Sequence, residues 1–149
     1  MKINLGSGTQ PKQGYINLDG RNLPEVDVVR DILRGLPFAD NSIEEVFSEN
    51  FMEHLPQTEC IWVMNEIWRV LIPGGIAEHW IPPAGSMNFF QDPTHTAHWS
   101  ERTFNYFKAG DPKNAYYGGD IKPWDIEKIE LLNGEQILHV IIKKHNPGN

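Results

Sequence analysis

Residues 2–9, KINLGSGT, form a short apolar segment that runs directly into a Gly-x-Gly turn. Glycine suits a point where the backbone bends tightly and approaches a ligand, because a Cβ would clash there. A second apolar run, residues 15–19, ends in the carboxylate of Asp19. An acid at this position can accept hydrogen bonds from both hydroxyls of a ribose. The two segments predict strands that end at a nucleoside site. An ordinary tight turn is the alternative, because the third glycine of the dinucleotide fingerprint is absent.

Three later segments decide between these interpretations. They are LPFADNSIEEVF at residues 36–47, EHL at residues 53–55 and RVLIPGG at residues 69–75. Together with the first turn, and in this order, they resemble the class I S-adenosylmethionine (SAM)-dependent methyltransferases, specifically the type 11-like branch that acts on small molecules. The resemblance covers about residues 2–107. A nicotinamide-binding domain would explain the first turn and none of the later segments.

The resemblance implies an α/β fold, with a single SAM-binding methyltransferase-like domain over residues 1–149 and a Rossmann-like, mostly parallel sheet. The helix complement looks reduced, because too few residues separate the first three strands for crossovers of about a dozen residues. Helices are expected at residues 57–71 and, with Ser100 as N-cap, at residues 102–109. Apolar residues at three- and four-residue spacing should form the buried face of the first helix: Ile61, Met64, Ile67, Trp68 and Leu71.

The C-terminal part is predicted to be an antiparallel hairpin. Its strands are residues 126–132 and 135–144, joined by a two-residue turn at Asn133 and Gly134. Residues 137–142 are apolar on both faces, which suits an interior strand. We therefore expect the last strand to insert antiparallel between two others, as the resemblance also implies.

The expected helices both follow strands four and five, so right-handed crossovers place them on one face of the sheet. A largely parallel sheet normally has both faces apolar and covered. We therefore expect a second copy of the chain to cover the other face in a two-fold homodimer. The alternative is that the loops at residues 9–15 and 20–25 cover it.

The resemblance assigns SAM, as the cofactor, to residues at the carboxyl ends of the strands. Gly6, Ser7 and Gly8 would let the backbone reach the methionine portion, and Asp19 would hold the ribose. Asp31 would accept the exocyclic amino group of adenine, with a helix N-cap as its alternative role. The full expected set also holds residues near the strand tips: Leu5, Gly6, Ser7, Gly8, Asp19, Asp31, Ile32, Ser48 and Glu49.

Candidate catalytic residues follow from the chemistry of methyl transfer. The donor is already activated, so the protein mainly aligns a nucleophile and excludes water. His54 is a candidate base, because imidazole titrates near neutrality; a histidine that merely bonds to backbone is the alternative. Asp92 and His95, in QDPTH at residues 91–95, resemble a DPTH segment of the same branch and are expected on the acceptor side.

A metal site is the alternative role for part of this set. Asp92, His95 and His98 recur at three-residue intervals, and both residue types can bind zinc. Pro93 disfavours a helical arrangement of the three, and the resemblance requires no metal. We therefore expect none.

Composition limits the partners. The chain carries 13 basic and 20 acidic residues, a formal charge of −7, and no basic run, so we expect no nucleic-acid partner. The single cysteine, Cys60, excludes an intrachain disulfide and fits a reducing compartment. Met1 leads directly into the first strand without room for a signal peptide, and no apolar run reaches transmembrane length. We expect a soluble, cytoplasmic protein with no membrane partner.

These observations predict a SAM-dependent methyltransferase that acts on oxygen or nitrogen of a small-molecule acceptor. One alternative is a SAM-fold protein that binds a ligand without catalysis. Another is a transferase that uses a SAM derivative such as decarboxylated SAM, for example in aminopropyl transfer. Acceptor specificity should lie in the loops at residues 82–99 and 110–123, which carry no readable motif.

Overall fold

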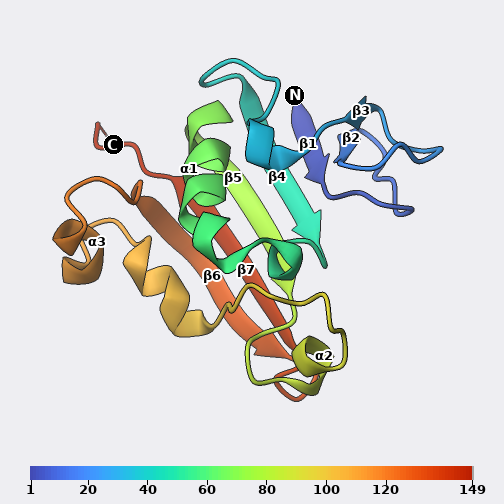
Figure 1. Ribbon diagram of the computed structural model, residues 1–149. Helices are drawn as coiled ribbons and strands as arrows, with labels where there is room; N and C mark the ends of the chain where they lie inside the picture. The colour runs from blue at the N-terminus through green and yellow to red at the C-terminus, as the bar shows by residue number, and fades with distance from the viewer. Residues whose placement is uncertain (149) are drawn as a thin grey trace.

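Seven strands form one mixed sheet, in the order β3-β2-β1-β4-β5-β7-β6, in the computed structural model, which describes residues 1–148 (Figure 1). β1 to β5 pair in parallel, and β7 lies antiparallel between β5 and β6. This confirms the predicted mostly parallel α/β sheet with an inserted antiparallel last strand. The strands are β1 (Lys2–Leu5), β2 (Ile16–Asp19), β3 (Val28–Val29), β4 (Ile43–Glu49), β5 (Leu71–Ile81), β6 (Trp124–Leu132) and β7 (Ile137–Lys144).

A turn and two asparagines replace the first crossover helix. Asn4 and Asn17 occupy paired positions on β1 and β2, and the Asn4 side-chain amide donates to Asn17 Oδ1 at 2.9 Å. The backbone N–H of Lys12 donates to the same oxygen at 2.8 Å, which holds the connection close to the sheet. Residues 6–15 and 20–27 contain no helix. The expected reduction of the helix complement is therefore confirmed for this part of the chain.

The helices are short apart from one. They are the α-helices α1 (Cys60–Val70), α2 (Met87–Phe90) and α3 (Pro112–Tyr116), and the 3₁₀ helices η1 (Ile32–Arg34), η2 (Met52–His54), η3 (Gln57–Glu59) and η4 (Glu101–Tyr106). Two of the loops predicted as irregular therefore contain a single helical turn. Within residues 1–148, none of these helices has the length and apolar character needed to span a bilayer.

The main helix was predicted in the right place with a partly wrong buried face. α1 buries five residues along one stripe: Cys60, Val63, Met64, Ile67 and Val70. Ile61 is instead 43% exposed, because the stripe begins one residue earlier than expected. Trp68 lies at its edge, where its indole N–H donates to the Pro123 carbonyl at 2.9 Å. Leu71 is buried but already belongs to β5, which begins directly after the helix.

The second predicted helix is a 3₁₀ helix that ends earlier. η4 stops at Tyr106 instead of residue 109, while its N-cap is the predicted Ser100. Ser100 and Thr103 form a reciprocal capping box, in which each side chain bonds to the other residue's backbone N–H. The aromatic residues around it, Trp99, Phe104 and Phe107, stack on one another in the core.

The hairpin has a wider turn than predicted. Leu132 pairs directly with Ile137, so four residues connect the two strands instead of two. Asn133, Gly134 and Glu135 all adopt positive φ angles. The backbone N–H of Gln136 then bonds to the Leu132 carbonyl at 3.1 Å and closes this wider loop.

The helices cover one face of the sheet, as expected. Figure 1 shows α1 on the near side of the central strands and α3 beyond the edge strand β6, and it draws no helix of the described residues behind the sheet. The covered face carries the buried apolar rows of the strands, such as Ile3, Val46, Ala77 and Ile142, which occupy adjacent register positions.

The far face is not apolar, which corrects the expectation. Its rows pair Lys2 with Glu45, and His139 with both Trp80 and Glu130. The imidazole of His139 stacks on Trp80 and bonds to Glu130 Oε1 at 3.0 Å and to Glu78 Oε1 at 2.8 Å. Charged and aromatic side chains therefore let this face meet water without a covering helix.

Candidate active site

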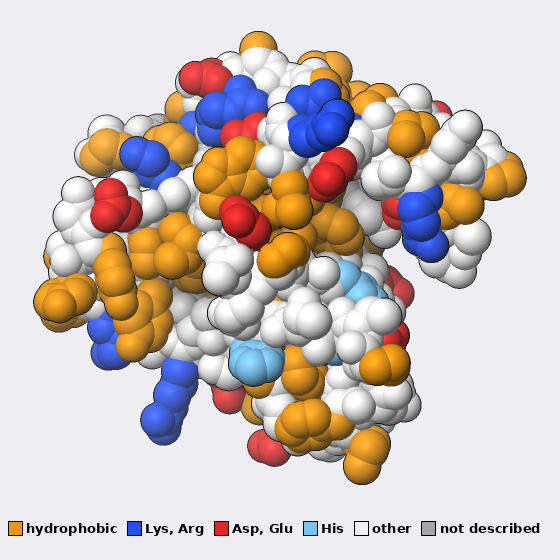
Figure 2. All heavy atoms as spheres, viewed as in Figure 1, with side chains coloured by type: hydrophobic (Ala, Val, Ile, Leu, Met, Phe, Trp, Pro, Cys, Tyr) orange, Lys and Arg blue, Asp and Glu red, His pale blue; other side chains and the backbone are white. Residues whose placement is uncertain are grey.

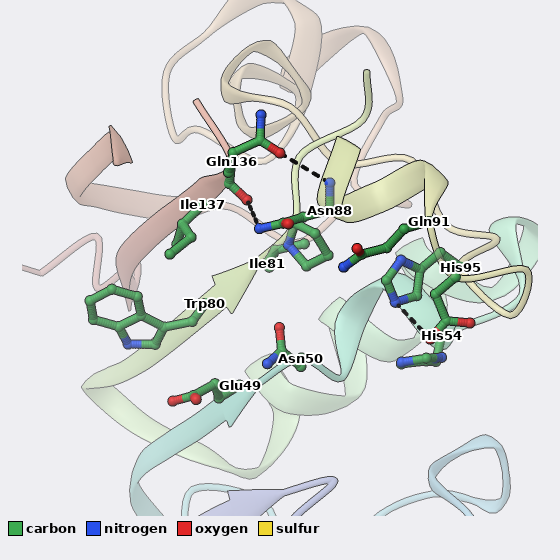
Figure 3. A pocket seen from close by; sticks show the side chains of 12 residues that line it. Glu49, Asn50, His54, Trp80, Ile81, Asn88, Gln91, His95, Gln136 and Ile137 are labelled. Carbon is green, nitrogen blue, oxygen red and sulfur yellow. Dashed lines mark hydrogen bonds and ion pairs between the residues drawn. The ribbon is translucent and has the colours of Figure 1, made fainter. Parts of the chain in front are cut away.

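Three adjacent pockets lie at the carboxyl ends of the parallel strands. The Asp19 pocket, about 190 Å³, is lined by Leu5, Gly6, Asp19, Asp31, Ile32, Phe51 and His54, among others. The glycine-turn pocket, about 410 Å³, is lined by residues 6–12 together with Asn4, Arg21, Phe47, Glu49 and Asn50. The His95 pocket, about 620 Å³, is lined by Glu49, Asn50, His54, Trp80, Asp92 and His95 with residues of α2 and the hairpin (Figure 3).

Shared walls join the three pockets into one groove. Gly6 borders both the Asp19 pocket and the glycine-turn pocket, and His54 borders both the Asp19 pocket and the His95 pocket. The glycine-turn pocket and the His95 pocket likewise share Glu49 and Asn50. A long ligand can therefore reach all three, which is the arrangement expected at the strand ends of an open α/β sheet.

Asp19 is a buried, ionised carboxylate at the tip of β2. Its Oδ2 accepts the Gly8 backbone N–H at 2.8 Å. Its Oδ1 accepts the backbone N–H and the Nε–H of Arg21, at 2.9 and 3.2 Å. Burial alone would raise the pKa of Asp19, but these hydrogen bonds outweigh it and the pKa lies below its usual value. The carboxylate is thus fixed in place, and Oδ2 still has a free acceptor site.

Gly6 is required by a side chain of the protein itself. Its φ is +68°, and a Cβ there would lie 2.1 Å from Cδ2 of Phe51. The sequence predicted that this glycine lets the backbone approach a ligand; in the structure the free space is filled by Phe51, which lines the Asp19 pocket. Gly8, with φ +51°, lines the glycine-turn pocket, and its backbone N–H donates to Asp19.

Asp31 has the N-cap role that was its alternative, and it also borders the Asp19 pocket. Its Oδ1 accepts the Leu33 backbone N–H at 3.0 Å and caps η1, while the residue also lines the Asp19 pocket. Leu5 and Ile32 are buried apolar walls of the same pocket. The Asp19 pocket is therefore lined by four of the residues that the sequence assigned to the cofactor: Leu5, Asp19, Asp31 and Ile32.

Ser48 does not reach any of the three pockets, which corrects its expected cofactor role. Successive side chains of β4 point to opposite faces, so Glu49 is exposed in the groove while Ser48 is fully buried under α1. The Ser48 hydroxyl bonds to Nδ1 of His79 at 2.7 Å. Ser7 is also buried, but it lines the glycine-turn pocket, and its hydroxyl has no hydrogen-bond partner among residues 1–148.

The Ser48–His79 pair gives a test by pH. Burial lowers the pKa of His79 to about 4 from an ordinary value of 6.5. Between pH 6.5 and 4 the unfolded chain takes up a proton that the folded chain refuses, so stability falls as the pH falls through this window. A shift of this size corresponds to about 3 kcal/mol. Urea unfolding at pH 7 and at pH 4 gives the free energy of unfolding that each protein loses on acidification. We expect this loss to be smaller in His79→Asn than in the wild type by about the same amount. Equal losses would contradict it.

The structure brings the three candidate catalytic residues together. The rings of His54 and His95 lie 4.8 Å apart, centroid to centroid, in an edge-to-face arrangement on the wall of the His95 pocket (Figure 3). Nε2 of His95 is 3.4 Å from Oδ2 of Asp92. Thr94 connects the group, because its hydroxyl donates to Asp92 Oδ1 at 2.7 Å and lies 3.1 Å from Nδ1 of His54.

Glu53 belongs to this cluster and was missed. Its carboxylate is fully buried, and Oε1 lies 3.7 Å from Nε2 of His54 and 4.0 Å from Nε2 of His95. Neither oxygen has a hydrogen-bond partner among the described residues. Burial raises the pKa of Glu53 to about 7, and the charge of Asp92 adds to the effect. Glu53 precedes His54 in the EHL segment, but a sequence does not reveal that an acid in a loop is buried.

His98 is separate from the cluster. It lines another pocket, of about 170 Å³, together with Gln57, Cys60 and Trp99, and its backbone N–H bonds to Gln57 Oε1 at 2.7 Å. The metal-binding alternative considered for Asp92, His95 and His98 therefore does not hold for this set of three.

Part of the wall of the His95 pocket comes from α2 and the hairpin turn. Gln136 accepts the backbone N–H of Asn88 at 3.0 Å through its side chain, and its carbonyl accepts the Asn88 side-chain amide at 3.1 Å (Figure 3). These bonds fix the hairpin turn against α2. The loop at residues 82–99 contributes to the lining of the His95 pocket, whereas none of residues 110–123 lines any of the three pockets of the groove. Further lining residues that sequence reasoning missed are Asn50, Trp80, Gln91 and Ile137.

The groove opens among mixed side chains on the surface. Figure 2 shows histidine side chains on the lower half of the visible face, with hydrophobic and acidic groups nearby. No broad cluster of Lys and Arg side chains surrounds these histidines in that view.

Comparison with known proteins identifies related sequences. Residues 8–78 match the family model of a type 11 methyltransferase domain, described as "Methyltransferase domain". An uncharacterized methyltransferase of Mycobacteroides abscessus is 31% identical over an alignment of 109 residues, and the match covers 67% of this chain. The chain spans 39% of that relative's length.

Solved structures share the fold at low sequence identity. A SAM-dependent methyltransferase from Archaeoglobus fulgidus superposes with a TM-score of 0.67 at 16% identity, covering 96% of this chain and 85% of that one. The [4+2]-cyclase SpnF superposes with a TM-score of 0.63 at 13% identity, covering 97% and 77%. The seven-stranded order with an antiparallel β7 is thus that of the class I methyltransferase fold.

Proposed function

We propose that this chain, which belongs to the type 11 methyltransferase domain family, transfers a methyl group from SAM to an oxygen or nitrogen atom of a small-molecule acceptor. SAM is the methyl donor of the family. The observation that carries the proposal is the joined groove, in which His54 borders both the pocket of the predicted nucleoside residues and the larger His95 pocket.

The cofactor residues divide between two pockets. In the Asp19 pocket, Asp19 would accept the ribose hydroxyls and Asp31 the adenine amino group, between the apolar side chains of Leu5 and Ile32. In the glycine-turn pocket, the unpartnered Ser7 hydroxyl and the exposed Glu49 carboxylate suit the polar ends of the methionine portion. The residues present fit the cofactor, because a fixed carboxylate, apolar walls and spare polar groups occur in that order along the groove.

The acceptor side is assigned to His54, Asp92 and His95. SAM supplies a methyl group already activated on a sulfonium, so the protein needs to hold the acceptor and keep water out. His54 is a candidate to take a proton from an acceptor hydroxyl or ammonium group. Its pKa is lowered by burial and by His95, which keeps the imidazole neutral and able to accept a proton.

Calorimetry with three ligands tests the proposal. We expect SAM and its demethylated product to bind at one site per chain, and decarboxylated SAM to bind more weakly because the carboxylate contacts are lost. Tighter binding of decarboxylated SAM would favour aminopropyl transfer. Binding of SAM without turnover on any acceptor of a broad panel would favour a ligand-binding role, which the fold also permits, since SpnF is named a cyclase. No binding of SAM would overturn the proposal.

We also infer that a second copy of the chain packs on the far face of the sheet as a two-fold homodimer. That face carries both charge signs, with Lys2 and Lys143 near Glu45 and Glu78 in adjacent rows. A two-fold axis can bring opposite charges together on such a face. Size exclusion with light scattering should give twice the chain mass of 17.1 kDa at micromolar concentration. A monomeric mass would mean that the charged face simply meets water.

A further inference from the structure

We propose that Glu53, His54 and His95 form a binding site for a divalent transition-metal cation of the zinc type, with Asp92 at its edge. One ligand atom from each of the first three can be chosen so that all lie within 4.8 Å of one another. The site lies on the wall of the His95 pocket and is independent of whether the chain transfers methyl groups. It differs from the set considered from the sequence, because Glu53 takes the place of His98.

The hydrogen bond of His95 fixes which of its nitrogens is free. Nδ1 of His95 lies 2.8 Å from the Phe89 carbonyl. A carbonyl oxygen only accepts, so Nδ1 carries the proton and donates it. In the neutral ring, Nε2 then has a lone pair, and this atom faces Glu53 and Asp92. A ring nitrogen that donates to a backbone carbonyl while the other faces a shared centre is the usual arrangement of a metal-binding histidine.

The same reasoning fixes His54 through Thr94. The Thr94 hydroxyl has one proton, and it donates this proton to the Asp92 carboxylate, which only accepts. The Thr94 oxygen must then accept the bond from Nδ1 of His54. Nε2 of the neutral His54 ring is therefore also unprotonated, and it points to Glu53 Oε1 at 3.7 Å.

Both ring nitrogens that face Glu53 are thus unprotonated, and the only proton that can lie between the three groups is one on the Glu53 carboxyl. Glu53 is fully buried, and neither of its carboxylate oxygens has a hydrogen-bond partner among residues 1–148. A buried, unpaired carboxylate is costly, and the two imidazole lone pairs directed at it add repulsion. A cation at their centre removes both problems. The two nitrogen–oxygen distances, 3.7 and 4.0 Å, slightly exceed the roughly 3.3 Å between tetrahedral ligands at bonds of about 2.0 Å.

The donor set indicates the class of metal. Two imidazole nitrogens with a carboxylate suit Zn²⁺ and its first-row neighbours, whereas Mg²⁺ and Ca²⁺ prefer oxygen ligands throughout. The His54 side chain is 38% exposed and lines the His95 pocket, while the Glu53 side chain is fully buried. A bound cation would therefore keep an open position towards the pocket. The cation would use the Nε2 lone pairs of both histidines. His54 would therefore be a ligand instead of a base in the metal-loaded protein.

Zinc titration of the chelator-treated chain tests the site. We expect calorimetry to show one Zn²⁺ per chain, with a dissociation constant raised at least 100-fold in Glu53→Gln and in His95→Ala. Glu53→Gln keeps the shape of the side chain but replaces the carboxylate by a neutral amide. The matched control is His98→Ala, a nearby histidine outside the cluster, which should bind zinc like the wild type. Mg²⁺ should produce no binding heat under the same conditions.

Two measurements keep the test decisive if a variant is unstable. Circular dichroism establishes that each variant is folded. Thr94→Val removes the hydroxyl that bonds to both His54 and Asp92, and it should weaken zinc binding about tenfold as loss of an outer partner does. Zinc binding that is equal in the wild type, Glu53→Gln and His95→Ala would overturn the proposal. So would a folded wild type that binds no zinc, since the buried carboxyl would then be held by a proton alone.

Discussion

Replacing Asp19 by alanine should weaken SAM binding at least tenfold. The carboxylate is buried, fixed by three N–H donors from Gly8 and Arg21, and keeps an acceptor site open to the pocket. Hydrogen bonds to a charged group contribute about 1.5–3 kcal/mol each, and 1.4 kcal/mol corresponds to a factor of about ten in affinity. Calorimetry on the folded variant measures the loss directly.

Two further variants separate the carboxylate from its surroundings. Asp19→Asn keeps the size of the side chain but loses the charge, so we expect an intermediate loss of affinity. Glu25→Ala removes an exposed acid of the adjacent loop that lines none of the three pockets, and SAM affinity should stay within twofold. If Asp19→Ala is folded and binds SAM as tightly as the wild type, Asp19 does not contact the cofactor.

Local sequence signals were sufficient for the sheet and for the Asp19 pocket. The apolar runs of β1 and β2 each end directly at the groove, so the residues at their ends, such as Gly6 and Asp19, are placed by strand length alone. Ser48 and Glu49 were both predicted to lie at the cofactor, but only Glu49 lines the groove. The side chains of a strand alternate, and only the tertiary position of α1 decides which of two adjacent residues is covered.

Errors in the helix and the hairpin have a different origin. Residues 60–71 hold two overlapping apolar stripes, and packing against the sheet selected the one through Val63 and Met64 over the one through Ile61. Asn133 and Gly134 do form part of the hairpin turn, but Glu135 also adopts a positive φ, which is uncommon for a residue with a side chain. The bond from Asn88 to Gln136, 48 residues apart, holds this wider turn.

The cluster of Glu53, His54 and His95 depends on contacts that no local pattern contains. Glu53 and His95 are far apart in the sequence, and they meet because the backbone N–H groups of Thr96 and Ala97 bond to the Glu53 carbonyl at 2.9 and 3.0 Å. This pairing brings the QDPTH segment against the EHL segment. The two motifs were recognised separately in the sequence, and only the fold turns them into one site.

Gly6→Ala should destabilise the chain by about 3–5 kcal/mol and remove SAM binding. A residue other than glycine at a left-handed φ costs about 1–2 kcal/mol. The added Cβ would also lie 2.1 Å from Cδ2, 2.5 Å from Cγ and 2.8 Å from Cβ of Phe51. The ring must therefore leave its place in the wall of the Asp19 pocket, and displacing a packed aromatic side chain costs several kcal/mol more.

Gly14→Ala is the matched control, because Gly14 has a similar φ of +84° and a Cβ added there would meet no atom within 4 Å. It should cost only the conformational term, about 1–2 kcal/mol, so the difference between the two variants in urea unfolding measures the contact with Phe51. The double variant Gly6→Ala/Phe51→Ala should cost less than the sum of the single changes, since the clash is absent in it. If Gly6→Ala costs no more than Gly14→Ala, Phe51 yields freely, and the glycine serves the ligand instead of the aromatic wall.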